Sequence, residues 1–250
     1  MSTTTTKPMQ IVMILDASGS MSSIQSDVIG SVNSFLDEEK AKKSQDLFTL
    51  IVFSDNVTTK VHKKPIKDVG DLTPEMYQIG GSTALFKAIV DTIESLKSED
   101  NLVMVIVTDG QENCSGPEYT RKRVFDLVQK CKAEKNWTFS YLSADIDTFD
   151  QGVALGFGGI DQNNVDVSSL KHKMASCNTT TGYLNLGKQI SQTTQKCVSI
   201  QKKNTANQTN QDYQTIQPEI DANSVAPSST SFFDSVSDLM SSVGNFFTGN

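Results

Sequence analysis

The sequence has no apolar run long enough to cross a bilayer, no long basic run and only two histidines. The first absence argues against a membrane-spanning protein, and no hydrophobic signal region is present. The second, together with a net charge of −7, argues against nucleic acid as a partner. Neither His62 nor His172 lies near the end of a predicted buried strand, so neither is expected to act as a base or a ligand.

The cysteines also lack any recognisable spacing. Four are present, at positions 114, 131, 177 and 197, without a Cys-x-x-Cys pair or a metal-finger pattern. Cys131 and Cys197 fall within helical patterns, where a free Cys behaves as a small apolar residue. We therefore expect reduced thiols in a reducing compartment and predict a cytoplasmic protein.

Short apolar runs that alternate with helical patterns indicate the fold class. Runs typical of strands buried on both faces lie at 11–15, 47–53, 102–107, 137–142 and 164–167. Residues 57–66 alternate apolar and polar side chains, which predicts an antiparallel edge strand. Helical patterns occupy 22–40 and 85–96, begin again at Ser115-Gly-Pro117, and recur within 180–203. The chain is thus predicted to be α/β: a doubly wound, mainly parallel sheet with helices on both faces.

The composition divides the chain into four parts. Residues 1–8 read as a polar tail, 9–202 as one domain, 203–230 as a flexible polar linker and 231–247 as an amphipathic helix. The polar face of that helix carries Asp234 and Asp238 but no Lys or Arg, so attraction to anionic lipid is absent. We expect it to dock in a protein groove, in cis or in trans, in preference to a membrane.

Oxygen-bearing residues gather where predicted strands end. Asp16, Ser18 and Ser20 follow the first strand, and an ordinary Ser-rich turn is the alternative interpretation. Asp109 follows the strand at 102–107, and Thr83 precedes the helix at 85–96, where it could also serve as the helix N-cap. Because sites in open parallel sheets assemble at the carboxyl ends of neighbouring strands, the three loops are expected to converge on one hard cation.

These residues resemble a known motif. Asp16-Ala-Ser18-Gly-Ser20, Thr83 and Asp109 are similar to the metal-ion-dependent adhesion site (MIDAS) of von Willebrand factor A (VWA) domains, especially the stand-alone intracellular microbial type. Residues 81–89 and 108–113 extend the resemblance, which covers roughly residues 9–200. It implies that the site holds Mg²⁺, with Mn²⁺ or Ca²⁺ as substitutes. It also implies that a Glu or Asp side chain of a partner protein completes the coordination sphere.

A hydrolase or phosphatase that uses Asp16 is the alternative function. Phosphatases with an aspartate nucleophile need a second acid two residues later, and this position is Ser18. The sequence also lacks a Gly-x-Ser-x-Gly elbow and a phosphate-binding loop. We therefore expect a binding protein and not an enzyme.

Overall fold

The structure is a computed structural model that describes residues 8–135, 137–143, 151–157, 192, 194–203 and 205. All of these belong to the first of two compact units, Met1–Thr209. The predicted strand at 164–167, Cys177, most of the linker and the amphipathic helix at 231–247 lie outside the described residues. The expectation that this helix docks in a protein groove stays a prediction.

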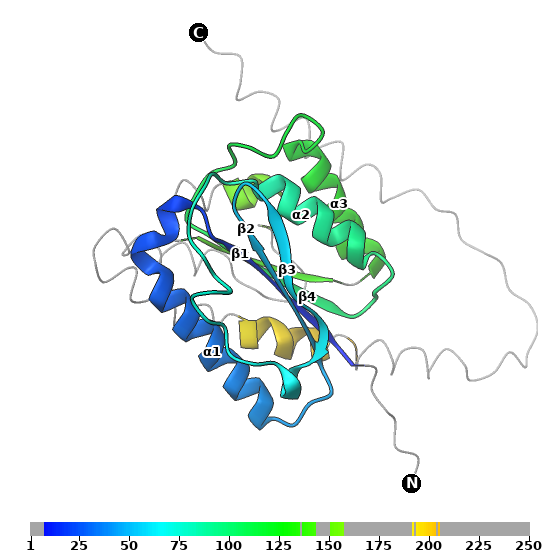
Figure 1. Ribbon diagram of the computed structural model, residues 1–250. Helices are drawn as coiled ribbons and strands as arrows, with labels where there is room; N and C mark the ends of the chain where they lie inside the picture. The colour runs from blue at the N-terminus through cyan, green and yellow to red at the C-terminus, as the bar shows by residue number, and fades with distance from the viewer. Residues whose placement is uncertain are drawn as a thin grey trace, which may run out of the picture. The chain divides into compact units, whose positions relative to one another are not determined.

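The described part of the chain forms a five-stranded sheet in the order β3-β2-β1-β4-β5 (Figure 1). The strands are β1 (Gln10–Asp16), β2 (Leu47–Phe53), β3 (Val57–Pro65), β4 (Leu102–Thr108) and β5 (Thr138–Ser143). Only β3, at one edge, runs antiparallel to its neighbour β2. Every residue of β1 and β4 is buried, as expected of strands covered on both faces. The predicted fold class and the antiparallel edge strand are therefore confirmed.

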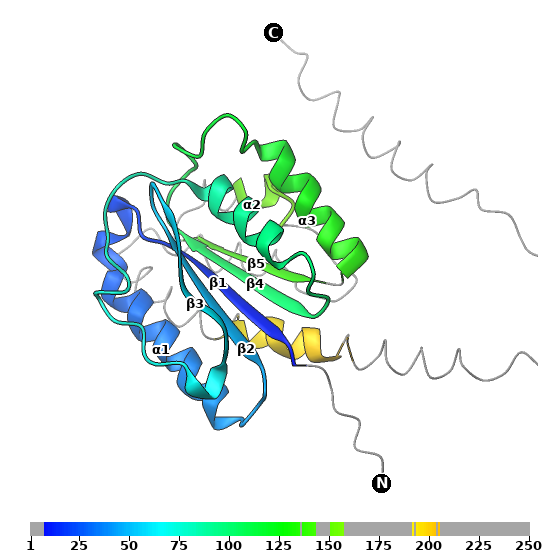
Figure 2. The same cartoon turned by 45° about the vertical axis from the view of Figure 1, so that its right-hand side comes forward.

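Helices cover both faces of the sheet (Figure 2). The helices are α1 (Gln25–Ala41), α2 (Leu85–Leu96) and α3 (Arg121–Lys135), with two short 3₁₀ helices, η1 (Gly19–Ile24) and η2 (Ile66–Asp68). Residues 194–203 are also helical, within the range predicted for the last helix. None of the helices that the structure describes is long and apolar enough to cross a membrane.

The central strand β1 divides its side chains between two hydrophobic cores. Ile11, Met13 and Leu15 pack with α1 and with Cys197 and Val198 of the last helix. Val12 and Ile14 point the other way and pack with α2 and α3. This alternation follows from the two-residue period of a strand, so one apolar run supplies both layers.

The predicted start of α3 is wrong. The helix begins at Arg121, and Ser115-Gly116-Pro117 lies in a turn in which Gly116 has a φ of +90°. The hydroxyl of Thr120 accepts a hydrogen bond from the Arg123 N–H at 3.2 Å, as an N-cap residue does. Pro117 is compatible with a first helical turn but does not require one, so the Thr120 cap decides the boundary.

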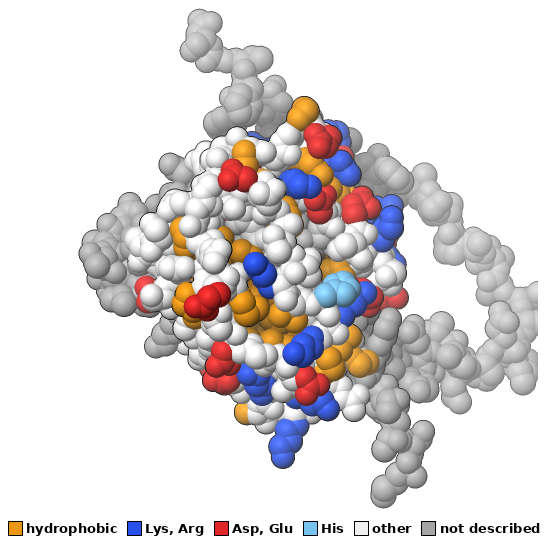
Figure 3. Space-filling view, in the orientation of Figure 1, with side chains coloured by type: hydrophobic (Ala, Val, Ile, Leu, Met, Phe, Trp, Pro, Cys, Tyr) orange, Lys and Arg blue, Asp and Glu red, His pale blue; other side chains and the backbone are white. Residues whose placement is uncertain are grey.

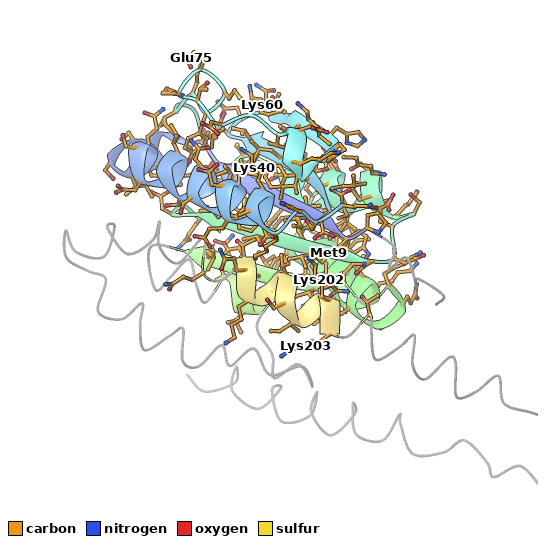
Figure 4. The ribbon with its side chains drawn as sticks, turned by 90° about the horizontal axis from the view of Figure 1, so that it is seen from below. Met9, Lys40, Lys60, Glu75, Lys202 and Lys203 are labelled. Atoms are coloured by element: carbon orange, nitrogen blue, oxygen red, sulfur yellow. The ribbon has the colours of Figure 1, made fainter. Side chains whose placement is uncertain are left out.

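The last described helix is attached to the amino end of the sheet. Lys202 forms an ion pair with Asp46 at 2.6 Å, and the Met9 N–H donates to the other oxygen of Asp46 at 3.1 Å. Figure 4 shows Lys202 on this helix close to Met9, just before the start of β1. The carboxyl-terminal half of this helix therefore lies at the amino end of the sheet.

The described cysteines, Cys114, Cys131 and Cys197, are free thiols. Burial raises the pKa of Cys131 and of Cys197 to about 11. Partial burial and the nearby charges of Asp55 and Glu112 also raise the pKa of Cys114, but its side chain is exposed to reagent. Since the thiolate is the reactive form, we expect Cys114 to be alkylated in the native protein at pH 8 while Cys131 and Cys197 are protected. After denaturation without reductant, all four cysteines should react. Mass spectrometry of alkylated peptides checks both steps, and a native disulfide would contradict the expectation.

Candidate metal centre

The candidate residues lie at the carboxyl ends of the two middle strands. Asp16 is the last residue of β1, and Asp109 directly follows β4. From β1 the chain continues to β2 on one side and later returns to β4 on the other, so the loops after β1 and β4 diverge. Such a switch point leaves a crevice between the loops, and this is where open α/β sheets bind their ligands.

Asp16 is completely buried, and hydrogen bonds hold both of its carboxylate oxygens. Its Oδ1 accepts the Ser18 N–H at 2.7 Å, and its Oδ2 accepts the Thr108 hydroxyl at 2.5 Å. Burial raises the pKa of Asp16, the nearby charge of Asp109 adds to the rise, and the hydrogen bonds from Thr108 and Ser18 oppose it. Although Asp16 is the last residue of its strand, its side chain is thus not exposed to solvent.

A chain of hydrogen bonds joins the two serines to Asp109. The Ser20 hydroxyl donates to Asp109 Oδ1 at 2.6 Å, and Ser18 Oγ lies 3.1 Å from Ser20 Oγ. Because a serine has one hydroxyl proton, Ser20 must accept from Ser18 while it donates to Asp109. The structure thus brings the predicted residues of the first and third loops together.

Thr83 reaches the same place from the loop before α2. A Cβ atom placed on Gly110 would lie 3.1 Å from Thr83 Oγ1 and 3.6 Å from Ser20 Oγ, so both hydroxyls border Gly110. Thr83 is buried, and its N–H donates to the Asn113 side chain at 2.8 Å. The N-cap position of α2 belongs to Ala84, so Thr83 does not cap the helix.

Backbone hydrogen bonds fix the first two loops against each other. The Gly19 N–H donates to the Gly81 carbonyl at 3.1 Å, and the Gly80 N–H donates to the Ala17 carbonyl at 2.8 Å. Gly81 has a φ of +81°, and a Cβ atom there would lie 2.1 Å from Asp55 Oδ2. The positive φ favours a glycine at position 81, and the two backbone hydrogen bonds hold the Thr83 loop beside the loop of Ser18 and Ser20.

Two positioning residues were not predicted as part of the site. Thr108 donates to Asp16, and the buried Tyr77 donates its hydroxyl to the Asp16 backbone carbonyl. Burial raises the pKa of Tyr77 well above its usual range, so its hydroxyl remains protonated as a donor. Thr108 could have been found from its place beside Asp109. Tyr77 lies in a loop without a recognisable motif, and only the tertiary structure places it under Asp16.

The loop after β4 is anchored to the start of α2. Glu112 Oε2 accepts the Phe86 N–H at 2.7 Å, and Glu112 Oε1 accepts the Ser115 N–H at 2.7 Å. The Ser115 hydroxyl in turn accepts the Lys87 N–H at 2.9 Å. Residues from a distant loop therefore satisfy the free N–H groups of this helix, and the Glu112 carboxylate lies at its positive end.

The chemistry of the donor groups fits a hard cation. The cluster offers two carboxylates and three hydroxyls, with no nitrogen or sulfur among the five side chains. Mg²⁺ prefers oxygen ligands, and one or two carboxylates with water are a common protein contribution. Across the described ranges, no group of three or more His, Cys, Asp or Glu side chains is placed to hold a metal. Metal binding at this site would therefore depend on the hydroxyl groups as well as on Asp16 and Asp109.

A comparison with known protein families identifies the domain as a VWA domain. Residues 2–138, more than half of the chain, match the family described as VWA domain containing CoxE-like protein. The chain belongs to this family. No curated protein matches the sequence.

Several solved structures are similar in fold. The manganese-loaded TRAP protein of Plasmodium vivax is 16% identical, with a TM-score of 0.45. The match covers 62% of this chain and 65% of the TRAP chain. The ArnB paralog VWA2 of Sulfolobus acidocaldarius is 16% identical with a TM-score of 0.39, and the match covers 55% of this chain but only 35% of that one. BatB of Bacteroides thetaiotaomicron is 19% identical with a TM-score of 0.37, covering 54% and 66%. At these identities the likeness concerns the fold alone.

Proposed function

We propose that this protein is a metal-dependent protein-binding module. Five side chains hold Mg²⁺, and a Glu or Asp side chain of a partner protein completes its coordination sphere. The five are Asp16, Ser18, Ser20, Thr83 and Asp109. The observation that carries the proposal is the convergence of their oxygen atoms from three loops at the switch point of the sheet.

The exposure of the cluster supports binding from one side. Asp16, Ser18 and Thr83 are buried, whereas Ser20 is exposed and Asp109 is half-buried. A ligand would therefore approach past Ser20 and Asp109. The three hydroxyl ligands carry no charge and leave a divalent cation electron-poor, which favours an anionic group of the partner as a further ligand. Mn²⁺ and Ca²⁺ also bind oxygen donors and are expected to substitute for Mg²⁺.

The contacts of Asp16 favour binding over hydrolysis. A nucleophilic carboxylate must itself contact the substrate, whereas the side chain of Asp16 is fully buried. Each of its oxygens accepts one hydrogen bond and keeps a second lone pair, which can serve an ion or a water held between the loops. The described histidine, His62, lies exposed on the edge strand β3. We therefore propose that the protein has no hydrolase activity.

The proposal predicts partner capture that depends on the cation. Immobilised full-length protein, incubated with lysate of its source in Mg²⁺, should retain a partner that is released by chelator. Asp109→Ala should fail to capture it, because the variant lacks one of the two carboxylate ligands.

Asp55→Asn is the matched control for this experiment. Asp55 is an exposed acid near the same loops, and an Asn there can still accept the Ser82 N–H at 2.9 Å. Quantitative mass spectrometry of the eluates measures the outcome. Equal capture by wild type and Asp109→Ala, with or without chelator, would refute metal-dependent binding.

A further inference from the structure

A second surface lies on the edge strand, away from the metal centre. A groove of about 640 Å³ runs between the second half of β3 and the loop after η2. Its lining includes the apolar side chains of Val61, Val69 and Met76. Figure 3 faces this side of the molecule, where hydrophobic side chains lie between Lys side chains near the histidine.

Lysines without ion pairs border this groove. Lys60 and Lys64 line it and are exposed, and no carboxylate among the described residues pairs with either of them. Lys63, in contrast, pairs with Glu99 at 2.7 Å. The one acidic residue of the lining, Asp71, lies 3.6 Å from the Lys40 amine. The groove thus has a local excess of positive charge, although the whole chain has a net charge of −7.

Protection of the sheet edge does not by itself explain these lysines. Charged side chains, proline and bulges all discourage pairing between edge strands. The β2–β3 ladder already shifts register twice, and Pro65, at the end of β3, has no N–H to donate. Lys63 has a φ of +44°, which interrupts the regular edge further. We therefore expect a partner to bind here through side-chain contacts and not by pairing its backbone with β3. Protection of the sheet edge also does not explain why the groove has an apolar floor.

We propose that this groove binds an extended acidic segment of a partner protein. Carboxylates of the segment pair with Lys60 and Lys64, and an apolar side chain between them lies over Val61, Val69 and Met76. The net negative charge of the chain repels large polyanions such as RNA or an anionic membrane, whereas a short segment senses mainly the local lysines. This inference does not rest on the metal-dependent function, because no predicted metal ligand lines the groove.

The probe is a short fluorescein-labelled peptide in which Glu alternates with Val, and its counterpart has Gln in place of Glu. Fluorescence anisotropy with the full chain in chelator should show saturable binding of the acidic peptide alone, weakening as salt is added. Lys60→Glu/Lys64→Glu should reduce the affinity about tenfold or more, because two attractive contacts become repulsive. Val61→Thr should reduce it to a smaller extent through the apolar floor.

Lys196→Glu/Lys203→Glu is the matched control, because it changes the net charge equally at two exposed lysines of the last helix. It should alter the affinity less than about twofold. An equal loss in both double variants, or no saturable binding by the wild type, would overturn the proposal. The proposal would also be overturned if RNA or anionic vesicles bound through Lys60 and Lys64 while the acidic peptide did not bind. Circular dichroism melts verify that each variant is folded, and Val61→Thr tests the groove without a charge change.

Discussion

Asp109→Ala and Asp16→Asn are each expected to abolish Mg²⁺ binding. The site offers two carboxylates, and hydroxyl groups alone bind a divalent cation weakly in competition with water. Isothermal titration calorimetry of the wild type with Mg²⁺ or Mn²⁺ should fit one site, and neither variant should release binding heat. Unchanged metal affinity in both variants would refute the assignment of the site.

Asn is preferred to Ala at position 16 because the Asp16 side chain is fully buried. Asn can accept the Ser18 N–H with its oxygen and donate its NH₂ group to Thr108. The Thr108 hydroxyl can then donate to the Gly110 carbonyl, which lies 3.1 Å away. Ala would leave the Ser18 N–H and the Thr108 hydroxyl without their acceptor in a buried site. This would lower the stability of the fold whether or not Asp16 binds a metal.

The same variant separates metal binding from stability. Burial raises the folded-state pKa of Asp16 above its ordinary value of 3.8, so the ionised carboxylate destabilises the fold without a cation. This loss of folding stability is present at neutral pH and disappears as the pH falls through the raised pKa of Asp16. In chelator, Asp16→Asn should therefore melt at the wild-type temperature or higher, while the stabilisation of the wild type by Mg²⁺ is lost in the variant. A large decrease in melting temperature in chelator would show that Asp16 has a mainly structural role.

Glu112→Ala is expected to destabilise the domain by about 2–3 kcal/mol. The substitution removes the acceptor of the Phe86 N–H and of the Ser115 N–H, and it removes a negative charge from the positive end of α2. A loss of this size corresponds to a decrease in melting temperature of about 5–10 °C for a domain of this length. Thermal denaturation followed by circular dichroism measures it.

Glu118→Ala is the matched control, because Glu118 is an exposed acid in the same loop. Its melting temperature should stay within about 2 °C of wild type, as is usual for exposed positions. Glu112→Gln should be intermediate, since it keeps a side-chain acceptor but loses the charge. Equal effects of Glu112→Ala and Glu118→Ala would show that the anchoring of this loop contributes little.

Local patterns in the sequence were sufficient to predict most of the fold. Buried parallel strands consist of apolar runs, and an amphipathic helix repeats its apolar residues every three or four positions, so both leave a local signal. The edge strand β3 was predicted from its alternation. The start of α3 was predicted wrongly, because Pro117 is compatible with both a turn and a first helical turn. The Thr120 cap decides between the two.

The tertiary structure decided how the candidate site is built. The sequence by itself indicated the five oxygen-bearing residues, because each lies at a strand end or before a helix and the topology of a parallel sheet brings such positions together. It did not indicate that Asp16 is fully buried, that Tyr77 bonds its carbonyl or that Glu112 holds the start of α2. These contacts join residues that are far apart in the chain. Their geometry depends on how the loops pack over the finished sheet, and no local periodicity encodes it.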